Sequence, residues 1–413
     1  MKIELIVIGN EVLLGHTMNT NAAFIGKELH KKGYTISRQT TLPDEEGILL
    51  EGLREALRRS DLVISTGGLG PTVDDVTRNI AAELFDSDFH FDKNVAKDLE
   101  NRFGKDLPTL QNQATVPTQA EVLINTIGTA PGMVLNNEMG TLLMLPGVPN
   151  EMHPMFLEQA IPYLLKHFPL KKQFFYKTIN LFEIPEFSVD PFLRELKEKY
   201  PDVEFGIYPS LGVLSLQFST YAEEAETAMR RIDLPRSEIE MKFASNCFES
   251  ESGKLEETVQ HIFVENQWTL SIAESCTGGS ASSGLTQLSG ASEYFLGSIV
   301  SYANSLKTDL LGVPESLIKE KGAVSEEVVS KMVEGVLEAT GSDFGLAVSG
   351  IAGPTGGTAR KPVGTVWCAV CRKGKKPHTW KLQARGTRQM IINRSVNSLL
   401  SNLLLYTKET SLL

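Results

Sequence analysis

Hydrophobic and polar positions switch between two periods along the amino-terminal part of the chain. The short apolar run KIELIVIG (2–9) predicts a buried strand. A helical repeat follows from Asn21 to about Lys32 and stops at Gly33, where a helix is expected to end. The same change of period then predicts a strand at 34–41, a helix from about 45 to 59, a strand at 61–66 and a helix at 76–85. Strands and helices that alternate in this way predict a parallel sheet with helices on both faces.

The pattern changes between about Leu170 and Cys247. A strand, a helix and two more strands are expected there, followed by a charged helix from Ala222 to about Arg231. Few side chains in this stretch suggest chemistry. We therefore expect a small α+β module that links its neighbours or takes part in dimerisation.

A second series of alternating elements begins after the polar linker NCFESESGK (246–254). Ser252 is expected to cap a helix over 254–268. Further strands are predicted at 269–275, 298–304, 344–350, 364–370 and 378–384, and further helices at 278–288, at 325–340 and from Thr387. The predicted fold class is therefore α/β. Two three-layer α/β domains, at 1–169 and 253–413, are joined by the small α+β domain at 170–248.

Composition and charge narrow the class of protein. Hydrophobic residues make up 41% of the chain and charged residues 22%, as in ordinary globular proteins. A formal charge of -11 argues against a nucleic-acid partner held by a broad basic surface. No apolar run approaches the ~20 residues that span a bilayer, so no membrane partner is expected. Four cysteines in 413 residues do not make a disulfide framework, and we expect a cytoplasmic protein.

Two local patterns suggest chemistry but have simpler interpretations. Cys368 and Cys371 form a CxxC pair, which can bind zinc or carry redox chemistry. The pair lies in the mostly apolar run TVWCAVC (365–371), so a buried strand is the better interpretation. The basic run at 372–376 is interpreted as a solvated hairpin tip.

The turn AESCTGG (273–279) is the first candidate site, because it joins a predicted strand to a predicted helix. Ser275, Cys276 and Thr277 could each act as a nucleophile. Ligands of open α/β sheets bind at the carboxyl ends of strands, and the first N–H groups of a helix can bind an anion. Turns of this kind also occur merely as connectors, and that alternative stays open.

A nucleophilic serine needs a base, and the choice in this domain is narrow. His261 and His378 are the histidines after residue 252, and neither is expected at the carboxyl end of a strand. A Ser-His-Asp arrangement is therefore not expected. Lys307 follows the predicted strand at 298–304 and would reach the same edge of the sheet. A lysine can act as a base when burial lowers its pKa, although an arbitrary lysine is usually a solvated surface residue.

Motifs in the last domain resemble the carboxy-terminal domain of the CinA family. They are AESCTGG (273–279), SYANSLK (301–307), AVSGIAGPTGG (347–357), KPVGTVW (361–367) and GTR (386–388). The resemblance implies a nicotinamide-nucleotide amidase that uses a serine–lysine dyad, and Ser275 and Lys307 match the two residues. The implied reaction converts nicotinamide mononucleotide to nicotinate mononucleotide and ammonia through an acyl-enzyme, without a cofactor. Cys276 would then be a packed neighbour.

The same resemblance gives the remaining motif residues roles in substrate binding. Backbone N–H groups near 277–279 or 349–350 would form the oxyanion hole, and the loop after 350 would wrap a phosphate or ribose. Arg388 would hold the phosphate. The expected substrate-binding residues of this site are Thr277, Gly278, Gly279, Tyr302, Asn304, Ser349, Gly350, Gly353 and Arg388. A purely structural role is the alternative for each of them.

A second candidate site lies in the first domain, at DLVISTGGLGPTVDDVTR (61–78). Glycines at 67, 68 and 70 would let backbone N–H groups converge on a phosphate. Asp74 and Asp75 could hold Mg²⁺, or one of them could simply cap the following helix. The pattern is neither a P-loop nor a GxGxxG fingerprint.

This first domain resembles the molybdopterin-binding fold, in the version found at the amino end of CinA proteins. The matching stretches are 9–21, 67–75, 126–133 and 145–152. The resemblance implies hydrolysis of ADP-ribose to AMP and ribose 5-phosphate, with a divalent metal (Mg, Mn or Co) and possibly potassium. Asp74, Asp75 and Glu11 are the candidates for metal binding, and Asp75 is also the candidate catalytic residue. The candidates for substrate contact are Gly67, Gly68, Gly70, Thr77 and Asn112.

The sequence thus predicts a bifunctional hydrolase of pyridine-nucleotide salvage, and the resemblance implies a homodimer. Two alternatives stay open at this point. The chain could be a non-catalytic pterin- or nucleotide-binding protein that acts in competence or in the response to DNA damage. It is also possible that only one half of the chain is active.

Overall fold

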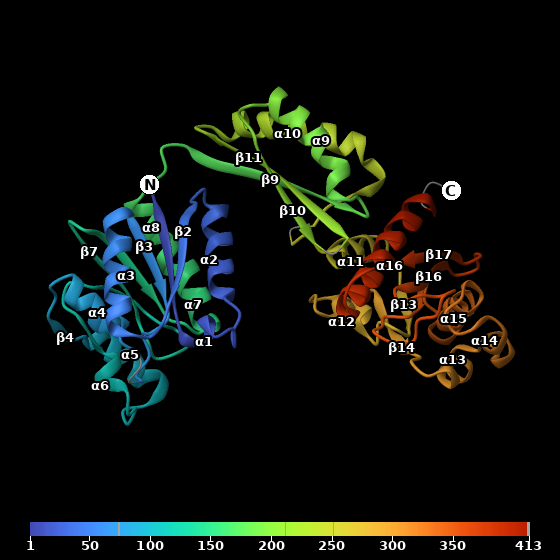
Figure 1. Cartoon of the computed structure of the whole chain (residues 1–413), viewed down its shortest axis with the longest axis horizontal. Coiled ribbons are helices and arrows are strands. Elements are labelled where there is room, and N and C mark those ends of the chain that lie inside the picture. Colours follow the sequence, from blue (N-terminus) through green and yellow to red (C-terminus); the bar gives the residue numbers. More distant parts are fainter. Residues whose placement is uncertain (73–74, 211, 251, 411–413) are drawn as a thin grey trace. The chain divides into compact units, whose positions relative to one another are not determined.

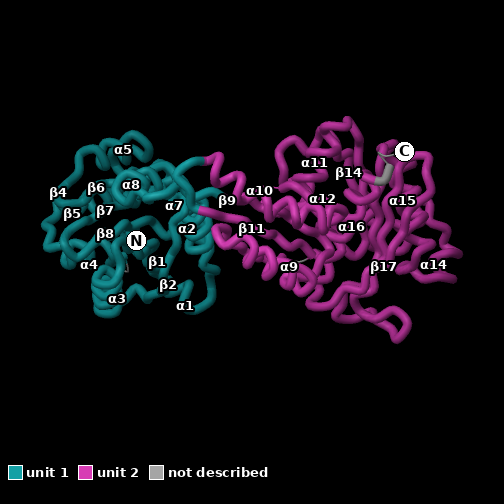
Figure 2. The backbone as a smooth tube through the Cα atoms, turned by 90° about the horizontal axis from the view of Figure 1, so that it is seen from above, with its two compact units in different colours: residues 1–175, 221–224 teal, residues 176–220, 225–413 magenta. Residues whose placement is uncertain are grey.

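The structure is a computed structural model that describes residues 1–72, 75–210, 212–250 and 252–410, with the side chains of 409 and 410 left out. The chain divides into two compact units, shown in different colours in Figure 2. Unit 1 comprises Met1–Phe175 and Tyr221–Glu224, and unit 2 comprises Tyr176–Thr220 and Ala225–Leu413. Most of the expected middle domain therefore groups with the last domain in one unit.

The central sheet of unit 1 has the strand order β2-β1-β3-β8-β7-β6. Its parallel strands are β1 (Ile3–Ile8), β2 (Ile36–Leu42), β3 (Leu62–Thr66) and β8 (Gly140–Leu145). The antiparallel strands β7 (Gly132–Asn137) and β6 (Glu121–Leu123) extend one edge. Every residue of β1 is buried, as the continuous apolar run predicts for a strand covered on both faces.

Helices cover both faces of this sheet (Figure 1). Alternate residues of β1 belong to different cores, since Ile3, Leu5 and Val7 pack in one cluster and Ile6 and Ile8 in the other. The first cluster lies under α2 (Thr20–Lys31), α7 (Pro149–Met155), the π-helical turn Phe156–Ala160 and α8 (Ile161–His167). The second lies under α3 (Glu46–Arg59) and α4 (Thr77–Leu84).

Shorter elements complete unit 1. A one-turn helix, α1 (Asn10–Leu13), follows β1. The remaining elements are β4 (Phe89–Phe91), α5 (Lys93–Phe103), α6 (Leu110–Gln113) and β5 (Thr115–Pro117). Strands β4 and β5 pair with each other in a separate antiparallel sheet.

The small module has the strand order β10-β11-β9-β12 and follows the expected order of elements. The strands are β9 (Gln173–Phe182), β10 (Glu204–Ser210), β11 (Val213–Ala222) and β12 (Cys247–Phe248). The helices are α9 (Glu186–Lys199), α10 (Ala225–Lys242) and the short 3-10 helix Ala244–Asn246. Helix α10 is longer than the charged helix predicted to end near Arg231, because it continues through Pro235.

The large sheet of unit 2 has the strand order β14-β13-β15-β16-β17. Strands β13 (Leu270–Glu274), β14 (Phe295–Val300) and β15 (Phe344–Gly350) are parallel. Strands β16 (Thr365–Arg372) and β17 (His378–Gln383) are antiparallel, so the sheet is mixed. Cys368 and Cys371 are buried on β16, which confirms the interpretation of the CxxC pair as part of a strand.

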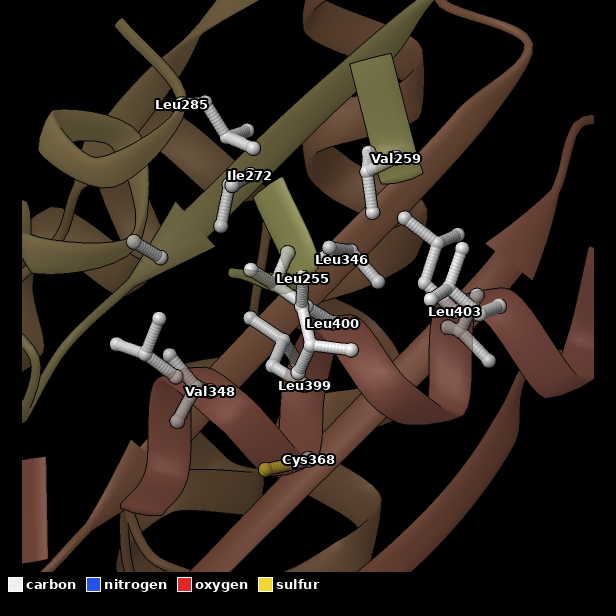
Figure 3. Packing of buried hydrophobic residues seen from close by; sticks show 14 of the residues in the cluster. Leu255, Val259, Ile272, Leu285, Leu346, Val348, Cys368, Leu399, Leu400 and Leu403 are labelled. Carbon is white, nitrogen blue, oxygen red and sulfur yellow. The ribbon is translucent and has the colours of Figure 1, made fainter. Parts of the chain in front are cut away.

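Helices again lie on both faces. On one face are α11 (Leu255–Glu265), α12 (Ser280–Thr286) and α16 (Arg388–Thr410), with the 3-10 helix Ala291–Glu293 beyond α12. Figure 3 shows this core, in which Ile272 of β13 meets side chains from α11, α12 and α16. On the other face are α13 (Asn304–Leu311), α14 (Glu315–Lys321) and α15 (Glu326–Thr340). The two α/β domains of the predicted fold class are thus confirmed as three-layer structures.

Two local predictions in unit 2 are wrong. The run at 298–304 is a strand only to Val300, and its end turns into α13. Ser252 does not cap α11, whose N-cap residue is Lys254, and the hydroxyl of Ser250 instead accepts a hydrogen bond from the Lys254 backbone N–H at 2.9 Å.

Helices α13 and α15 approach so closely that Gly335 cannot carry a side chain. A Cβ atom at Gly335 would lie 2.0 Å from the backbone oxygen of Leu311, the last residue of α13. Alanine inside a helix is normally about 1 kcal/mol more favourable than glycine. Here we expect Gly335→Ala to destabilise unit 2 by about 1–3 kcal/mol through overpacking. Thermal unfolding followed by tryptophan fluorescence measures this, since Trp268, Trp367 and Trp380 all lie in unit 2.

Gly284→Ala in α12 is the matched control. Its added methyl group meets the end of the flexible Glu256 side chain, at 2.7 Å, rather than backbone. We expect its unfolding temperature to stay close to that of the wild type. A Gly335→Ala protein that melts at or above the wild-type temperature would show that the helices can separate without cost.

Candidate active site

The turn after β13 brings Ser275 to the carboxyl edge of the large sheet. Gly278 and Gly279 have φ values of 59° and 98°, which glycine adopts without strain. The Gly278 N–H donates to the Ser275 backbone oxygen at 3.1 Å and closes the turn before α12. The side chain of Ser275 is buried, so a substrate must enter a pocket to reach it.

Lys307 reaches Ser275 from the neighbouring helix. Its Nζ lies 3.0 Å from Ser275 Oγ, and Nζ also donates to the backbone oxygen of Ser301 at 2.6 Å. The first distance is within the range needed for direct proton transfer. Lys307 is only 1% exposed, although lysine is among the residues least often buried.

Burial has opposite consequences for the amine and for the neighbouring thiol. It lowers the pKa of Lys307 from its ordinary value of 10.5, because a buried ammonium loses its hydration. In the described part of the chain, no carboxylate forms an ion pair with Lys307 that would restore the charge. Burial raises the pKa of Cys276 to about 12, so this thiol stays protonated at neutral pH. The local environment therefore favours Ser275 over Cys276 as the nucleophile.

A cavity of about 220 Å³ opens beside these two side chains. Residues from the turn, from α13, from the segment before α15 and from the end of β15 surround it. They are Ser275, Cys276, Tyr302, Asn304, Lys307, Ala323, Val324, Ser349, Gly350, Ala352 and Arg388. The structure thus brings together most of the residues expected at this site.

Arg388 lies at the rim of the cavity, at the first residue of α16. Its guanidinium donates to the Gly353 backbone oxygen at 2.7 Å and to Tyr302 Oη at 2.9 Å. Gly353 is therefore next to the site through its backbone. The rim carries an exposed cation and a half-exposed phenol, which together can meet an anionic part of a ligand.

Side-chain hydrogen bonds fix the segment before α15, which forms another wall of the cavity. Ser349 Oγ donates to the Ala323 backbone oxygen at 2.8 Å. Lys361 Nζ donates to the backbone oxygens of Lys321 and Val324, each at 2.7 Å. The hydroxyl of Ser349 therefore serves the wall of the pocket and does not point freely to a ligand.

Three expected ligand contacts of the turn are already used inside the protein. Thr277 Oγ1 and the Gly279 N–H donate to the Glu274 carboxylate at 2.7 and 2.9 Å, and the Gly278 N–H is bonded to Ser275. The expectation that this helix end binds a ligand anion is therefore wrong for these groups. The backbone N–H of Cys276 donates to no other described residue, and Cys276 lines the cavity, so this N–H is the donor left for an oxyanion.

Sequence reasoning missed Glu274 and the backbone oxygen of Ser301. A carboxylate at the end of the apolar run TLSIAE is the signal that could have pointed to Glu274, because an acidic residue in a buried strand needs partners. Ser301 acts through its backbone, for which the sequence carries no signal.

In unit 1, the glycine turn after β3 is as close-packed as its composition suggests. A Cβ at Gly67 would lie 2.1 Å from the Ile8 backbone oxygen, and one at Gly68 would lie 2.1 Å from Thr77 Oγ1. Thr77 Oγ1 donates to the Gly67 backbone oxygen at 3.2 Å. Thr77 therefore lies against the glycine turn, and its hydroxyl is engaged in holding it.

The acidic candidates of unit 1 do not form a complete metal site in the described part of the chain. Asp74 lies outside the described residues. Asp75 Oδ2 accepts hydrogen bonds from the Thr72 N–H and Oγ1 at 2.9 and 2.6 Å, and the exposed Glu11 folds its carboxylate beside Gly9. Among the described residues, no group of three His, Cys, Asp or Glu side chains is placed to hold a metal. The metal site stays a prediction.

Asn112 is held by an arginine that the sequence analysis did not single out. The Arg78 guanidinium donates to the backbone oxygen and to Oδ1 of Asn112, at 2.7 and 3.0 Å. Burial lowers the pKa of Arg78 from its ordinary value. Gly70 lies beside the Asp75 carboxylate, since a Cβ there would be 2.5 Å from Asp75 Oδ2.

Comparison with known proteins places the whole chain in one family. Residues 252–407 match the family model of the CinA C-terminal domain, and residues 4–166 match that of a probable molybdopterin binding domain. A CinA-like protein of Endomicrobium trichonymphae is 38% identical over 424 residues, which cover 97% of each chain. The chain belongs to the CinA family.

Other CinA relatives are similar to this chain over different lengths. A putative competence-damage inducible protein of Symbiobacterium thermophilum is 38% identical over 381 residues, which cover 90% of this chain and 89% of the relative. A crystal structure of CinA from Thermoplasma acidophilum, described as of unknown function, is 35% identical with a TM-score of 0.37. It covers 39% of this chain and 96% of that one. Within the described residues of this CinA chain, no helix has the length and apolar character needed to cross a membrane.

The lowered pKa of Lys307 predicts a pH-dependent stability. Between the folded-state pKa and 10.5, the unfolded chain binds more protons at Lys307 than the folded chain does. The unfolding free energy of the wild type should therefore rise with pH across this window, relative to that of Lys307→Met. Urea unfolding followed by tryptophan fluorescence at pH 8, 9, 10 and 10.5 measures the difference. If the unfolding free energies of the wild type and of Lys307→Met changed with pH in the same way, the lowered pKa of Lys307 would be contradicted.

Proposed function

We propose that unit 2 is a nicotinamide-nucleotide amidase in which Ser275 is the nucleophile and Lys307 is the general base. The contact of 3.0 Å between Ser275 Oγ and a buried amine carries the proposal. An uncharged amine has one lone pair and two N–H groups. With one N–H donated to the Ser301 oxygen, the lone pair can face Ser275.

The geometry supports acyl transfer in two stages, formation of an acyl-enzyme and its hydrolysis. The Ser275 hydroxyl gives its proton to Lys307 Nζ while Oγ bonds to the carboxamide carbon of the substrate. The Lys307 ammonium then protonates the amide nitrogen, the C–N bond breaks and ammonia leaves an acyl-enzyme. Water gives a proton to Lys307 and attacks the ester carbon, and the C–Oγ bond breaks as Oγ regains the proton. The products are the carboxylic acid and the free enzyme.

The shape of the cavity supports a nucleotide substrate that is only partly enclosed. A volume of about 220 Å³ suits an aromatic carboxamide rather than a whole nucleotide. The ribose and phosphate would remain at the rim, where Arg388 offers a bidentate donor. The tetrahedral oxyanion would be held by the backbone N–H of Cys276.

Replacing the nucleophile separates this proposal from a cysteine mechanism. Ser275→Ala should reduce the release of ammonia from nicotinamide mononucleotide by at least about 10³-fold, as expected when a nucleophile is removed. Cys276→Ala should retain most of the activity, because a thiol with a pKa of about 12 is protonated at neutral pH. A coupled ammonia assay measures both. If Cys276→Ala were the inactive protein, the assignment to the serine would be abandoned.

For unit 1, we propose hydrolysis of the pyrophosphate bond of ADP-ribose or similar compounds at the glycine turn. ADP-ribose is the substrate that the resemblance implies. The supporting observation is the close approach of Gly67 and Gly68 to Ile8 and Thr77 at the carboxyl edge of the parallel strands. Ligands of open α/β sheets bind at this edge. We derive no step through a divalent metal, because the described residues do not supply a three-ligand group.

An assay of AMP release tests the function of unit 1. The chain is incubated with ADP-ribose and potassium, and with Mg²⁺, Mn²⁺ or Co²⁺ in turn. We expect Asp75→Asn to lower the rate at least about tenfold, since it removes a charge from the turn. Asp88→Asn, the same change at an exposed position of unit 1, should not lower it. If the folded wild type is inert with ADP-ribose and with nicotinamide mononucleotide, the binding-protein alternative is favoured.

A further inference from the structure

We propose that Glu274 is a positioning residue of the amidase site, an internal carboxylate that holds the nucleophile turn in its reactive geometry. The inference rests on the amidase function proposed above. Glu274 is the last residue of β13, directly before Ser275, and its side chain is fully buried. It has no place in the acyl-transfer steps.

The Glu274 carboxylate is the hub of a hydrogen-bond network around the turn. It accepts from the hydroxyl of Thr277 and the N–H of Gly279 within the turn, and from residues of the first turn of α12 and of β14 beyond it. Oε2 accepts from Thr277 Oγ1 at 2.7 Å, Gly279 N at 2.9 Å and Ala281 N at 3.3 Å; Oε1 accepts from Ser282 N at 2.9 Å, from Ser282 Oγ and, at 3.5 Å, from Ser298 Oγ.

These bonds explain how a buried carboxylate is tolerated without a cation. In the described part of the chain, Glu274 forms no ion pair, and an unpaired buried charge is strongly destabilising. Backbone N–H groups and hydroxyls can offset that cost, because hydrogen bonds to a charged acceptor are roughly twice as strong as neutral ones. The carboxylate and the turn therefore require each other. The turn supplies the donors, and the carboxylate fixes where those donors lie.

The alternation of side chains along β13 explains how the anchored Glu274 carboxylate orients Ser275. Neighbouring residues of a strand point to opposite faces of the sheet. Leu270 and Ile272 pack in the cluster under α11, α12 and α16, and Ala273 packs in the cluster under α13 and α15. Glu274 lies on the same face as Leu270 and Ile272, and its carboxylate is hydrogen-bonded to α12. Ser275 lies on the same face as Ala273, toward α13. Its Oγ is 3.0 Å from Nζ of Lys307 on that helix.

The network also determines which N–H groups stay free. It takes the N–H groups of Gly279, Ala281 and Ser282, and the Gly278 N–H is bonded to Ser275. The Cys276 N–H donates to no other described residue, and Cys276 lines the cavity. Loss of the carboxylate would let the turn close differently, so both the nucleophile and the oxyanion donor would move.

The test is Glu274→Gln, which keeps the shape of the side chain but replaces one acceptor oxygen by an NH₂ group. We expect kcat for ammonia release to fall about tenfold to a hundredfold, as for a displacement of reacting groups by about 1 Å. The KM should stay within about twofold, because the rim that meets the nucleotide is untouched. The pH midpoint of kcat should not move, because Glu274 acts on position and not on the proton affinity of Lys307. Glu293→Gln, the same change at an exposed position, is the matched control.

A substrate-independent readout separates this inference from the proposed function. The rate at which a fluorophosphonate probe labels Ser275 should fall in Glu274→Gln as kcat does. If the wild type is labelled but releases no ammonia from nicotinamide mononucleotide, the proposed substrate is wrong, and the labelling rates still decide the role of Glu274. If the wild type is not labelled, both proposals fall.

Thr277→Val provides a second variant if Glu274→Gln does not fold. Valine has the shape of threonine, and the change removes one hydrogen bond to Glu274 Oε2. We expect kcat and the labelling rate to fall severalfold while KM and the pH midpoint stay unchanged. Wild-type kcat in a folded Glu274→Gln or in Thr277→Val would overturn the proposal. So would a rise in KM alone, or a shifted pH midpoint, which would assign Glu274 an electrostatic effect on Lys307 instead.

Discussion

The burial of one amine is the constraint on which the chemistry proposed for unit 2 depends. A lysine at the surface stays charged at neutral pH and cannot accept a proton from an alcohol. At 1% exposure, Lys307 loses the hydration that stabilises its ammonium, and its pKa falls. The Ser301 backbone oxygen then orients the amine, and Ser275 lies at the remaining position. Each of these contacts is useful only because the lysine is held out of water.

The three-layer fold produces this arrangement through the positions of its strand ends, the close packing of two helices and the alternation of side chains along β13. Parallel strands β13, β14 and β15 end at the same edge, so the turn after β13 and the helix after β14 meet there. The absence of a side chain at Gly335 lets α13 lie directly against α15. The alternation of β13 sends Glu274 to one helical layer and Ser275 to the other. One strand end thus carries both the proposed anchor and the proposed nucleophile, and each role falls to a different residue.

Much of this was predictable from periodicity, and the failures have specific causes. Alternating strands and helices predicted both sheets, and strand ends together with the resemblance pointed to Ser275 and Lys307. The strand predicted at 298–304 lies at Phe295–Val300 instead, because the backbone of SYAN (301–304) already turns toward α13. The role of Glu274 was missed because three of its bonds come from backbone N–H groups, for which the sequence carries no signal.

The position of Glu274 also limits where the phosphate of a nucleotide can bind. The turn before α12 has the glycines and the helix end that usually indicate an anion site. Here the protein supplies its own anion, and a ligand phosphate at the same N–H groups would compete with Glu274 in a fully buried position. In the proposed amidase, the phosphate of the substrate would therefore be recognised from the open side of the cavity. Arg388 and Tyr302 lie at that rim, linked by a hydrogen bond of 2.9 Å. The substrate would accordingly enter with its carboxamide first.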